Sequence, residues 1–374
     1  MSIQRDSGSP QRPGEAERKR VVTDLPLAEF RPRSQVVLPE HRVERARCPA
    51  IDAHAHLGRW LSGWAGRDGE WAIPDVATWL EEMDAYNVRA FVNLDGRWGA
   101  ELDANLDRFD RAFPRRVATF CHVNWSALAT PGHDLVKDLA ASVRAGAAGL
   151  KVWKDLGLRV RDHRDELVLP DDPRLGDLWS AAGELGVPVW WHVADPVAFF
   201  QPVDGRNEYL ELLTDRPDWS YASDAFPPFQ RLIDAMETVV AAHPRTTFVG
   251  VHGGNYAENL GWVRRMLDTY PNLHIDIAAR IAQLGRQARA TRDLLLAHPD
   301  RVLFGADEIP PTGESYPIHF RFLETADECF PHSPEDPPPL GRWTISGLDL
   351  PDEVLAQVYA GNALGLLPHL EVRA

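Results

Sequence analysis

Two histidines lie two residues apart in the segment Asp52-Ala53-His54-Ala55-His56, within a short apolar run. In a β-strand, residues i and i+2 share a face with Cα atoms roughly 7 Å apart, so both imidazole rings can reach the same ion. Zinc accepts imidazole nitrogens at about 2.0–2.1 Å. The pair is therefore predicted to form half of a metal site, although two histidines at this spacing also occur as ordinary polar residues at a sheet edge.

Further ligands come from distant parts of the sequence, where His192 and Asp307 each follow a short apolar run. We expect His54, His56, His192 and Asp307 to surround one Zn²⁺ or another divalent transition metal, with room for a water or substrate oxygen. Taken alone, His192 would equally suit a core histidine bonded to a backbone carbonyl. Asp307 would equally suit a helix cap, but a buried carboxylate needs a compensating charge, which a metal provides.

The elements that must position these residues alternate along the chain from residue 51 onward. Eight short apolar runs, separated by segments of helical period, are predicted to be strands: 51–57, 90–95, 117–123, 148–153, 187–193, 247–252, 273–278 and 302–307. Eight strand and helix units predict an α/β fold, a (β/α)8 TIM-like barrel, in which active side chains gather at the C-terminal ends of the strands. The alternative is a doubly wound open sheet, but no glycine-rich nucleotide motif follows any run.

Two connections are longer than a barrel needs, one after the fifth strand (196–226) and one after the eighth (308–347). Both contain several aromatic residues. Long loops on the catalytic face commonly cover a pocket, and plain packing or contact within a homo-oligomer would explain them equally well.

Composition narrows the class of protein. The 374 residues are 44% hydrophobic and carry 40 basic against 55 acidic side chains, a net charge of −15 that disfavours nucleic acid as a partner. No apolar run approaches the roughly 18 residues of a membrane span. The three cysteines lie far apart, which fits a reducing, cytoplasmic location. A small-molecule substrate is the expected partner.

The chain is predicted to have three parts. Residues 1–50 are expected to form a polar N-terminal leader and extension, and the first 20 of them are rich in arginine, glutamate, glycine, proline and serine. Residues 51–367 form the barrel, and residues 368–374 form a C-terminal tail.

The sequence resembles the amidohydrolase superfamily, specifically its amidohydrolase-related branch, which contains metal-dependent hydrolases and nonoxidative decarboxylases. The likeness covers about residues 51–367. It rests on Asp52-Ala53-His54-Ala55-His56, Gly149-Leu150-Lys151, His192, His252, Phe304-Gly305-Ala306-Asp307 and Gly361-Asn362-Ala363. After the strand-eight acid, the family often has an aromatic residue and proline, whereas this chain continues Glu308-Ile309-Pro310.

The resemblance implies a role for each matched residue. His54, His56 and His192 would bind the metal, and Asp307 would bind it and also take a proton from its water. His252 would polarise the substrate carbonyl, donate to the leaving group or complete the metal shell. A histidine tied into the glycine-rich turn Gly253-Gly254 is the alternative reading of His252.

Lys151 bears on the number of ions. In binuclear members of the superfamily a lysine at this position takes up carbon dioxide, and its carbamate bridges two metals. Many proteins of the related branch hold one metal without the bridge. We expect one ion, with Lys151 a metal ligand only if it is carbamylated and otherwise a cation that binds substrate or lies beside the site.

The expected activity is hydrolysis of an amide, ester or lactone carbonyl by metal-bound hydroxide, with Asp307 and His252 as the catalytic residues. Trp153 and Trp191, together with Lys151, are predicted to contact the substrate, although tryptophan is also ordinary core material. The alternative activity is metal-dependent nonoxidative decarboxylation of an aromatic or enoic carboxylic acid. A barrel kept only for binding is a third hypothesis.

Overall fold

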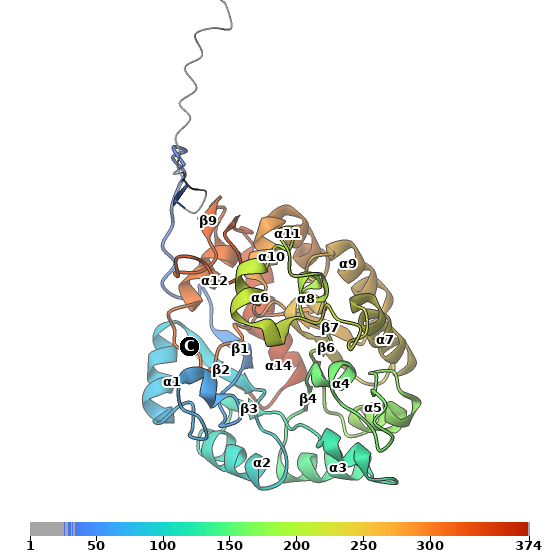
Figure 1. Ribbon diagram of the computed structural model, residues 1–374. Helices are drawn as coiled ribbons and strands as arrows, with labels where there is room; N and C mark the ends of the chain where they lie inside the picture. Colours follow the sequence, from blue (N-terminus) through green and yellow to red (C-terminus); the bar gives the residue numbers. More distant parts are fainter. Residues whose placement is uncertain (1–25, 27–28, 31, 33, 373–374) are drawn as a thin grey trace, which may run out of the picture. The chain divides into compact units, whose positions relative to one another are not determined.

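In a computed structural model of the chain, eight parallel strands form a barrel (Figure 1). Their bounds are β1 Ala50–Ala55, β2 Val88–Asn93, β3 Val117–Thr119, β4 Leu150–Val152, β5 Val189–Trp191, β6 Phe248–Gly250, β7 Leu273–Asp276 and β8 Val302–Leu303. Continuous pairing gives the orders β1-β2-β3 and β4-β5-β6-β7-β8. The two groups are joined by backbone hydrogen bonds, because Ala53 N donates to Phe304 O and Cys121 N donates to Gly149 O, both at 2.9 Å. The predicted (β/α)8 barrel is confirmed.

Each strand ends earlier than its apolar run predicts. β8, for example, ends at Leu303 rather than at Asp307. The residues beyond the ends belong to loops, where their side chains turn toward the mouth of the barrel. This placement agrees with the general location of active sites in the fold.

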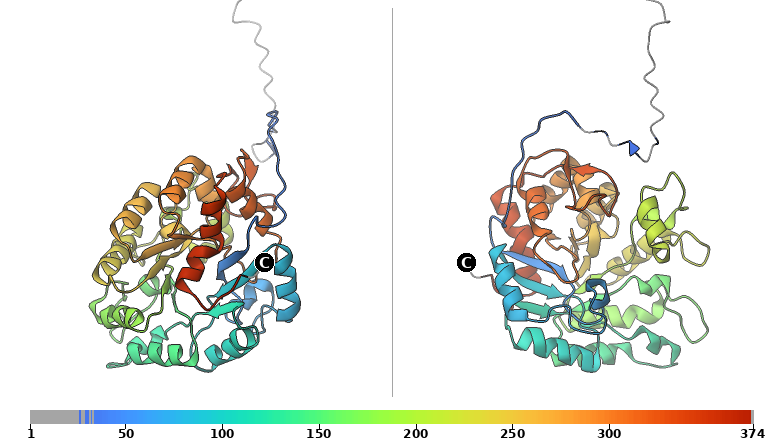
Figure 2. Two further views of the ribbon diagram at one scale, coloured as in Figure 1. Left: turned by 180° about the vertical axis from the view of Figure 1, so that it is seen from behind. Right: turned by 60° about the vertical axis from the view of Figure 1, so that its left-hand side comes forward.

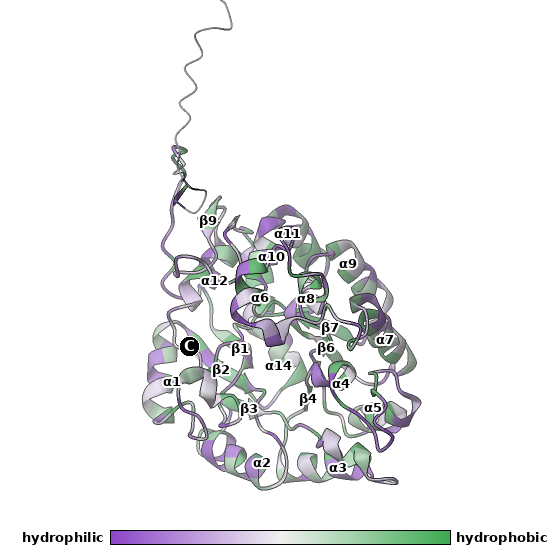
Figure 3. Ribbon diagram, viewed as in Figure 1, coloured by the Kyte–Doolittle hydropathy of each residue, from purple (hydrophilic) through white to green (hydrophobic). Residues whose placement is uncertain are grey.

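Helices follow the strands along the outside of the barrel (Figure 1). The longer ones are α1 Val76–Ala85, α2 Gly99–Leu106, α3 Leu135–Ala145, α5 Gly176–Glu184, α7 Phe229–Ala242, α9 Leu260–Thr269, α11 Ala288–Ala297 and α12 Tyr316–Glu324. Shorter helices are α4 Asp155–Leu158, α6 Leu210–Asp215, α8 Val251–Gly254, α10 Ile281–Arg286, α13 Asp352–Ala356 and α14 Asn362–Leu366. Colouring by hydropathy shows polar and apolar bands on the same outer helices (Figure 3), as expected for helices with one buried face.

Side-chain caps explain where several helices begin. The carboxylate of Asp75 accepts from Thr78 N at 3.1 Å and that of Asp134 accepts from Lys137 N at 3.0 Å. Each bond satisfies an N–H group that has no partner within its helix. The side chain of Asp75 therefore caps the first turn of α1.

The barrel interior is a separate apolar cluster whose members alternate along the strands. It contains Ile51, Ala90, Val92, Trp190 and Val249, all fully buried. Ala363 and Leu367, from α14 and the residue after it, pack against the same cluster. Figure 2 shows α14 from behind, at the end of the barrel opposite the long loops. The interior is therefore filled with side chains, and a ligand has room only at the mouth.

The long connections after the fifth and eighth strands have their own short elements. Between β5 and α7 lie α6 and three-residue and four-residue 3₁₀ turns, and this segment brings Phe199, Trp219 and Tyr221 to the mouth of the barrel. After β8 come α12 and the antiparallel pair β9 Phe330–Pro331 and β10 Thr344–Ile345.

The structure describes residues 26, 29–30, 32 and 34–372. Pro39–Ala374 forms one compact unit, separate from Met1–Leu38. Most of the predicted polar leader, and the last two residues of the predicted tail, lie outside the described residues. Across the described part of the chain, no helix is both long and apolar enough to cross a membrane.

Candidate metal centre

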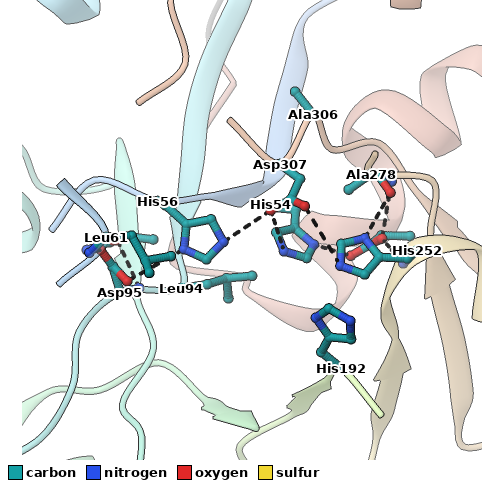
Figure 4. Close-up of polar contacts among 12 residues, drawn as sticks. His54, His56, Leu61, Leu94, Asp95, His192, His252, Ala278, Ala306 and Asp307 are labelled. Atoms are coloured by element: carbon teal, nitrogen blue, oxygen red, sulfur yellow. Dashed lines mark hydrogen bonds and ion pairs between the residues drawn. The ribbon is translucent and has the colours of Figure 1, made fainter. Parts of the chain in front are cut away.

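Three imidazole rings converge on the carboxylate of Asp307 at the mouth of the barrel. His54 Nε2 lies 3.3 Å and His56 Nε2 lies 3.2 Å from Asp307 Oδ1. His252 Nε2 lies 3.8 Å from Asp307 Oδ2. Figure 4 shows His56 on one side of the carboxylate and His54 and His252 on the other. The structure therefore brings together His54, His56 and Asp307, as the sequence predicts for a metal site.

The outer nitrogens of His54 and His252 are each held by an acceptor. His54 Nδ1 lies 2.8 Å from Asp276 Oδ2, and His252 Nδ1 lies 2.9 Å from Ala278 O. A carbonyl oxygen can only accept, so the proton of His252 is on Nδ1 and its Nε2 carries a lone pair. The same argument applies to His54 beside the Asp276 carboxylate. Both rings therefore present bare Nε2 atoms to the Asp307 carboxylate.

The arrangement of these rings around the Asp307 carboxylate favours the binding of a cation. Burial, and after it the charge of Lys151, lowers the pKa of His54, while burial and Arg280 hold the pKa of His252 well below its ordinary value. Neutral rings with bare nitrogens repel a carboxylate oxygen at close range. A divalent transition metal accepts two or three imidazole nitrogens and a carboxylate oxygen, so the residues present fit such an ion.

The pKa values of His56 and Asp307 are shifted in opposite directions. Burial would lower the pKa of His56, but the hydrogen bond to Asp307 and the nearby carboxylate of Asp95, 3.6 Å away, outweigh it and raise the pKa to about 9. Burial would raise the pKa of Asp307, but the charge of His54 and the hydrogen bond from His56 hold it well below its ordinary value. Because His54 itself is kept neutral, the bond from His56 is the firmer cause. Asp307 is therefore ionised, with 23% of its side chain exposed to the cavity.

The backbone around the cluster is strained. His252 and Asp307 adopt positive φ angles of 59° and 67°, a left-handed conformation that is uncommon outside glycine. Gly305 allows the eighth strand to approach the first, because an added Cβ there would lie 2.8 Å from His54 Cβ. Such strain persists where the surrounding structure over-determines it, as at ligand sites.

His192 stands at the edge of the cluster. Its ring centroid lies 4.5 Å from that of His252, and its Nε2 lies 3.2 Å from Asp195 Oδ1. Neither close group of candidate ligand atoms among the described residues includes it. Figure 4 shows it beside His252, facing the same space. Its predicted role as a ligand stays a prediction.

Trp191 requires a correction. Successive side chains of a strand point to opposite faces, and Trp190 faces the barrel interior. Trp191 therefore points outward, where its ring packs against Trp179 of α5 and Phe248. It is fully buried there and does not line the cavity, so the expected contact with substrate is wrong.

Lys151 and Trp153, both predicted to contact the substrate, lie in different positions relative to the metal site. Trp153 lines the cavity at the metal site, as predicted for a substrate contact, and its ring lies 5.7 Å from that of His56. Lys151 does not line this cavity and belongs to neither group of candidate ligands among the described residues. Its Nζ lies 5.5 Å from the Trp153 ring centroid, on the wall of a second cavity. This position does not fit the prediction that an unmodified Lys151 contacts the substrate in the cavity at the metal site.

The cavity in front of the cluster, here called the main cavity, holds about 420 Å³. Its walls are rich in aromatic side chains from distant loops: Trp60, Trp64, Trp153, Phe199, Trp219 and Tyr221. Three cations also line it, Lys154, Arg159 and Arg280. Lys154 is paired with Asp195 at 2.5 Å, whereas the buried side chain of Arg280 donates, among the described residues, only to the backbone oxygen of Ala279, at 2.8 Å. Flat walls and a buried guanidinium suit a planar, acidic ligand.

Sequence reasoning missed Asp276 and the role of Asp52. Asp276 binds the ring of His54 and also accepts from His252 N at 2.7 Å. Asp52 accepts from His54 N at 3.0 Å, from Ala306 N at 3.1 Å and from the Tyr316 hydroxyl at 2.7 Å. A carboxylate inside a buried apolar strand is the signal that could have identified both.

Comparisons with known proteins agree with this geometry. A family model described as Amidohydrolase matches residues 51–368. No curated protein matches the chain. Among solved structures, 2,6-dihydroxybenzoate decarboxylase in complex with 2,6-dihydroxybenzoate is 15% identical with a TM-score of 0.56, and the match covers 86% of this chain and 99% of that one.

Two further structures share the fold. A dihydroxybenzoic acid decarboxylase from Polaromonas sp. JS666, with bound manganese and 2-nitroresorcinol, is 14% identical with a TM-score of 0.54, covering 86% of this chain and 97% of that one. An uncharacterised TIM-barrel protein from Bordetella bronchiseptica is 15% identical with a TM-score of 0.52, covering 86% and 99%. At these identities the likeness establishes the barrel.

Proposed function

The chain belongs to the amidohydrolase family, which is metal-dependent, and from that premise we propose that it hydrolyses an amide, ester or lactone carbonyl. The observation that carries the proposal is the convergence of His54, His56 and His252 nitrogens on the Asp307 carboxylate. The cluster lies at the base of the main cavity, where a substrate carbonyl would meet all four side chains.

One divalent transition ion, zinc or manganese, suits the donor set. His54, His56 and Asp307 would hold it, with His192 as a further ligand. The chemistry that such an ion supplies is activation of water near neutral pH and polarisation of a carbonyl oxygen. The partners of the outer ring nitrogens, Asp276 for His54 and Asp95 for His56, would keep both rings oriented.

Asp307 and His252 would move the protons. Asp307 is ionised and borders the cavity, so it can accept a proton from the attacking water. His252 Nε2 lies 3.8 Å from Asp307 Oδ2, so a proton accepted by Asp307 could reach His252 by way of the bound substrate. Because His252 is held through Nδ1 by Ala278 O and its Nε2 carries no proton, Nε2 would first take up the proton that Asp307 accepted from water and then give it to the leaving group.

The walls of the main cavity favour a planar substrate with a negative charge. Trp153 and Trp219 offer flat apolar faces, and Arg280 offers donors for a carboxylate. The loop segment that carries Phe199 and Trp219 would exclude water from the reacting carbonyl.

Nonoxidative decarboxylation of an aromatic or enoic acid is the second candidate. The buried Arg280 favours it, because a guanidinium beside aromatic walls can bind and orient a carboxylate at the cluster. Two of the structures with the same fold are decarboxylases of dihydroxybenzoates. In that reaction carbon dioxide leaves and a proton takes its place on carbon, a transfer for which Asp307 and His252 are placed.

The test is a substrate screen of the purified protein loaded with Zn²⁺ or Mn²⁺, using amides, lactones and aromatic acids in ¹⁸O-labelled water. Hydrolysis predicts one ¹⁸O atom in the acid product and no carbon dioxide. Decarboxylation predicts released carbon dioxide and no labelled acid product. Asp307→Asn is expected to lower turnover at least 100-fold, whereas His133→Ala, at an exposed site, should leave it unchanged; full activity of Asp307→Asn would refute both candidates.

A further inference from the structure

A second cavity lies behind the tryptophan wall of the main cavity. It holds about 180 Å³, and Trp60, Trp153 and Asp155 line both spaces. Its other polar side chains are Arg97, His122, Lys151, Asn124 and Ser126. No step of the proposed reaction uses this space.

Two donors on its wall are buried without a partner among the described residues. Lys151 is 1% exposed, and its Nζ has no hydrogen bond. Trp153 Nε1 is likewise buried and unbonded. A buried ammonium without an acceptor costs several kcal/mol unless a ligand or another charge compensates it. Both donors therefore lack the acceptor that their burial calls for.

A third donor, Arg97, adds a second positive charge. Its guanidinium is stacked between Trp60 and Trp98, with the central carbon 4.5 Å and 4.1 Å from the ring centroids. Within the described residues no ion pair joins Arg97 or Lys151 to a carboxylate. Stacking fixes the plane of a guanidinium and leaves its N–H groups free to donate.

Burial lowers the pKa values of Lys151 and Arg97, and nearby carboxylates oppose this effect: Asp307, Asp276 and Asp95 for Lys151, and Asp95 for Arg97. Among the described residues, however, none of these carboxylates is within ion-pair distance of either cation. His122 Nε2 lies 2.8 Å from Leu94 O, and burial lowers its pKa to about 3, so the ring is neutral. Asp155 is 3.9 Å from Arg159, which lines the main cavity. The residues that line the second cavity thus carry two cations and a buried indole N–H, together with several aromatic rings.

We propose that this second cavity is a binding site for a small planar carboxylate, held by Lys151, Arg97 and Trp153 Nε1. A carboxylate accepts several hydrogen bonds in one plane, which matches an ammonium, a guanidinium and an indole N–H. The tryptophan rings give a flat apolar surface for the body of the acid. The volume accommodates an acid of the size of acetate or benzoate without entry into the main cavity.

Calorimetric titration of the full chain with benzoate tests the site, with benzamide as the neutral compound of the same shape. We expect benzoate to bind at least tenfold more tightly than benzamide. Lys151→Met and Arg97→Gln should each weaken benzoate at least tenfold. Arg280→Gln, which removes the guanidinium that would bind a carboxylate in the main cavity, should change it less than twofold.

Three results would overturn the proposal: no binding of benzoate, equal binding of benzamide, or loss of binding in Arg280→Gln but not in Lys151→Met. The last would place the acid in the main cavity. Thermal unfolding of each variant checks its fold, and Arg97→Gln, at a half-buried position, decides the test if Lys151→Met does not fold. Anomalous diffraction from bound 4-bromobenzoate should place the bromine between Trp60 and Lys151; a peak only beside Asp307 would contradict the assignment.

Discussion

Asp276 Oδ2 lies 2.8 Å from His54 Nδ1, so a carboxylate at the end of β7 holds a histidine at the end of β1 across the barrel. The same carboxylate accepts from His252 N through Oδ1, at 2.7 Å. One buried side chain therefore holds the ring of His54 and the backbone of His252. Because it fixes the proton on the outer nitrogen of His54, it leaves the inner nitrogen available to a metal.

Replacing Asp276 with Asn should weaken metal binding while leaving the ligands in place. The amide can still bond but carries no charge, and loss of such an outer partner typically costs roughly 10–100-fold in metal affinity. Competition with a fluorescent zinc chelator would measure the change. Asp138→Asn, on the exposed part of α3, is the control. Equal affinity of Asp276→Asn and the parent protein would mean that Asp276 does not support the site.

Gly305→Ala should disturb the same centre by a steric route. The added Cβ would lie 2.8 Å from His54 Cβ, closer than packed carbon atoms approach, so His54 or the eighth strand must shift. We expect weaker metal binding, measured by the same competition. Gly176→Ala, where an added Cβ meets nothing within 4 Å, should behave as the parent protein. Unchanged affinity in Gly305→Ala would show that the close approach is not required.

Tyr316→Phe tests the support beneath the cluster. The hydroxyl donates to Asp52 Oδ2 at 2.7 Å, and Asp52 in turn holds His54 N and Ala306 N. Loss of a donor to a buried carboxylate should lower the free energy of unfolding by about 1.5–3 kcal/mol. Urea denaturation measures it. Tyr256→Phe, whose hydroxyl has no hydrogen bond within the described residues, should change stability little, and equal effects in the two variants would argue against the role of Asp52.

Asp110 predicts a pH dependence of stability. Burial, partly offset by hydrogen bonds from Thr119, raises the pKa of Asp110 from 3.8 to about 6. The folded state therefore keeps a proton that the unfolded chain releases, and stability falls as pH rises from about 4 to about 6. The loss is on the order of 3 kcal/mol.

Asp110→Asn should not show this loss, because the amide does not titrate. Unfolding free energies of both proteins between pH 4 and 7 measure the difference. The free energy of unfolding of Asp110→Asn, relative to that of the parent protein, should increase as the pH rises through this range. Parallel curves would mean that the carboxyl group titrates normally in the folded protein.

The sequence could predict the barrel because each strand is a short apolar run, and the runs are far enough apart for a helix between them. It could also predict His54, His56 and Asp307 as neighbours, because the C-terminal ends of all eight strands meet at one mouth. These residues required only the order of the elements. Asp276 satisfied the same rule but was hidden inside an apparently regular strand.

The sequence could not predict which face of a strand a side chain lies on, or how far from the cluster it lies. Trp190 and Trp191 differ by one position, and a shift of one residue exchanges the interior and exterior faces of a strand. Lys151 does not line the main cavity, whereas Trp153, two residues later, does. Neither the strand register nor the conformation of the loop after β4 is encoded in local composition.

The central claim is that His54, His56 and Asp307 hold a divalent metal at the mouth of the barrel. Anomalous diffraction at the zinc and manganese absorption edges, from crystals of the full chain, tests it most directly. The account predicts a peak among the His54 Nε2, His56 Nε2 and Asp307 carboxylate atoms, lost in His54→Ala. Metal-loaded crystals with no peak at these three residues, or a peak that persists unchanged in His54→Ala, would contradict it.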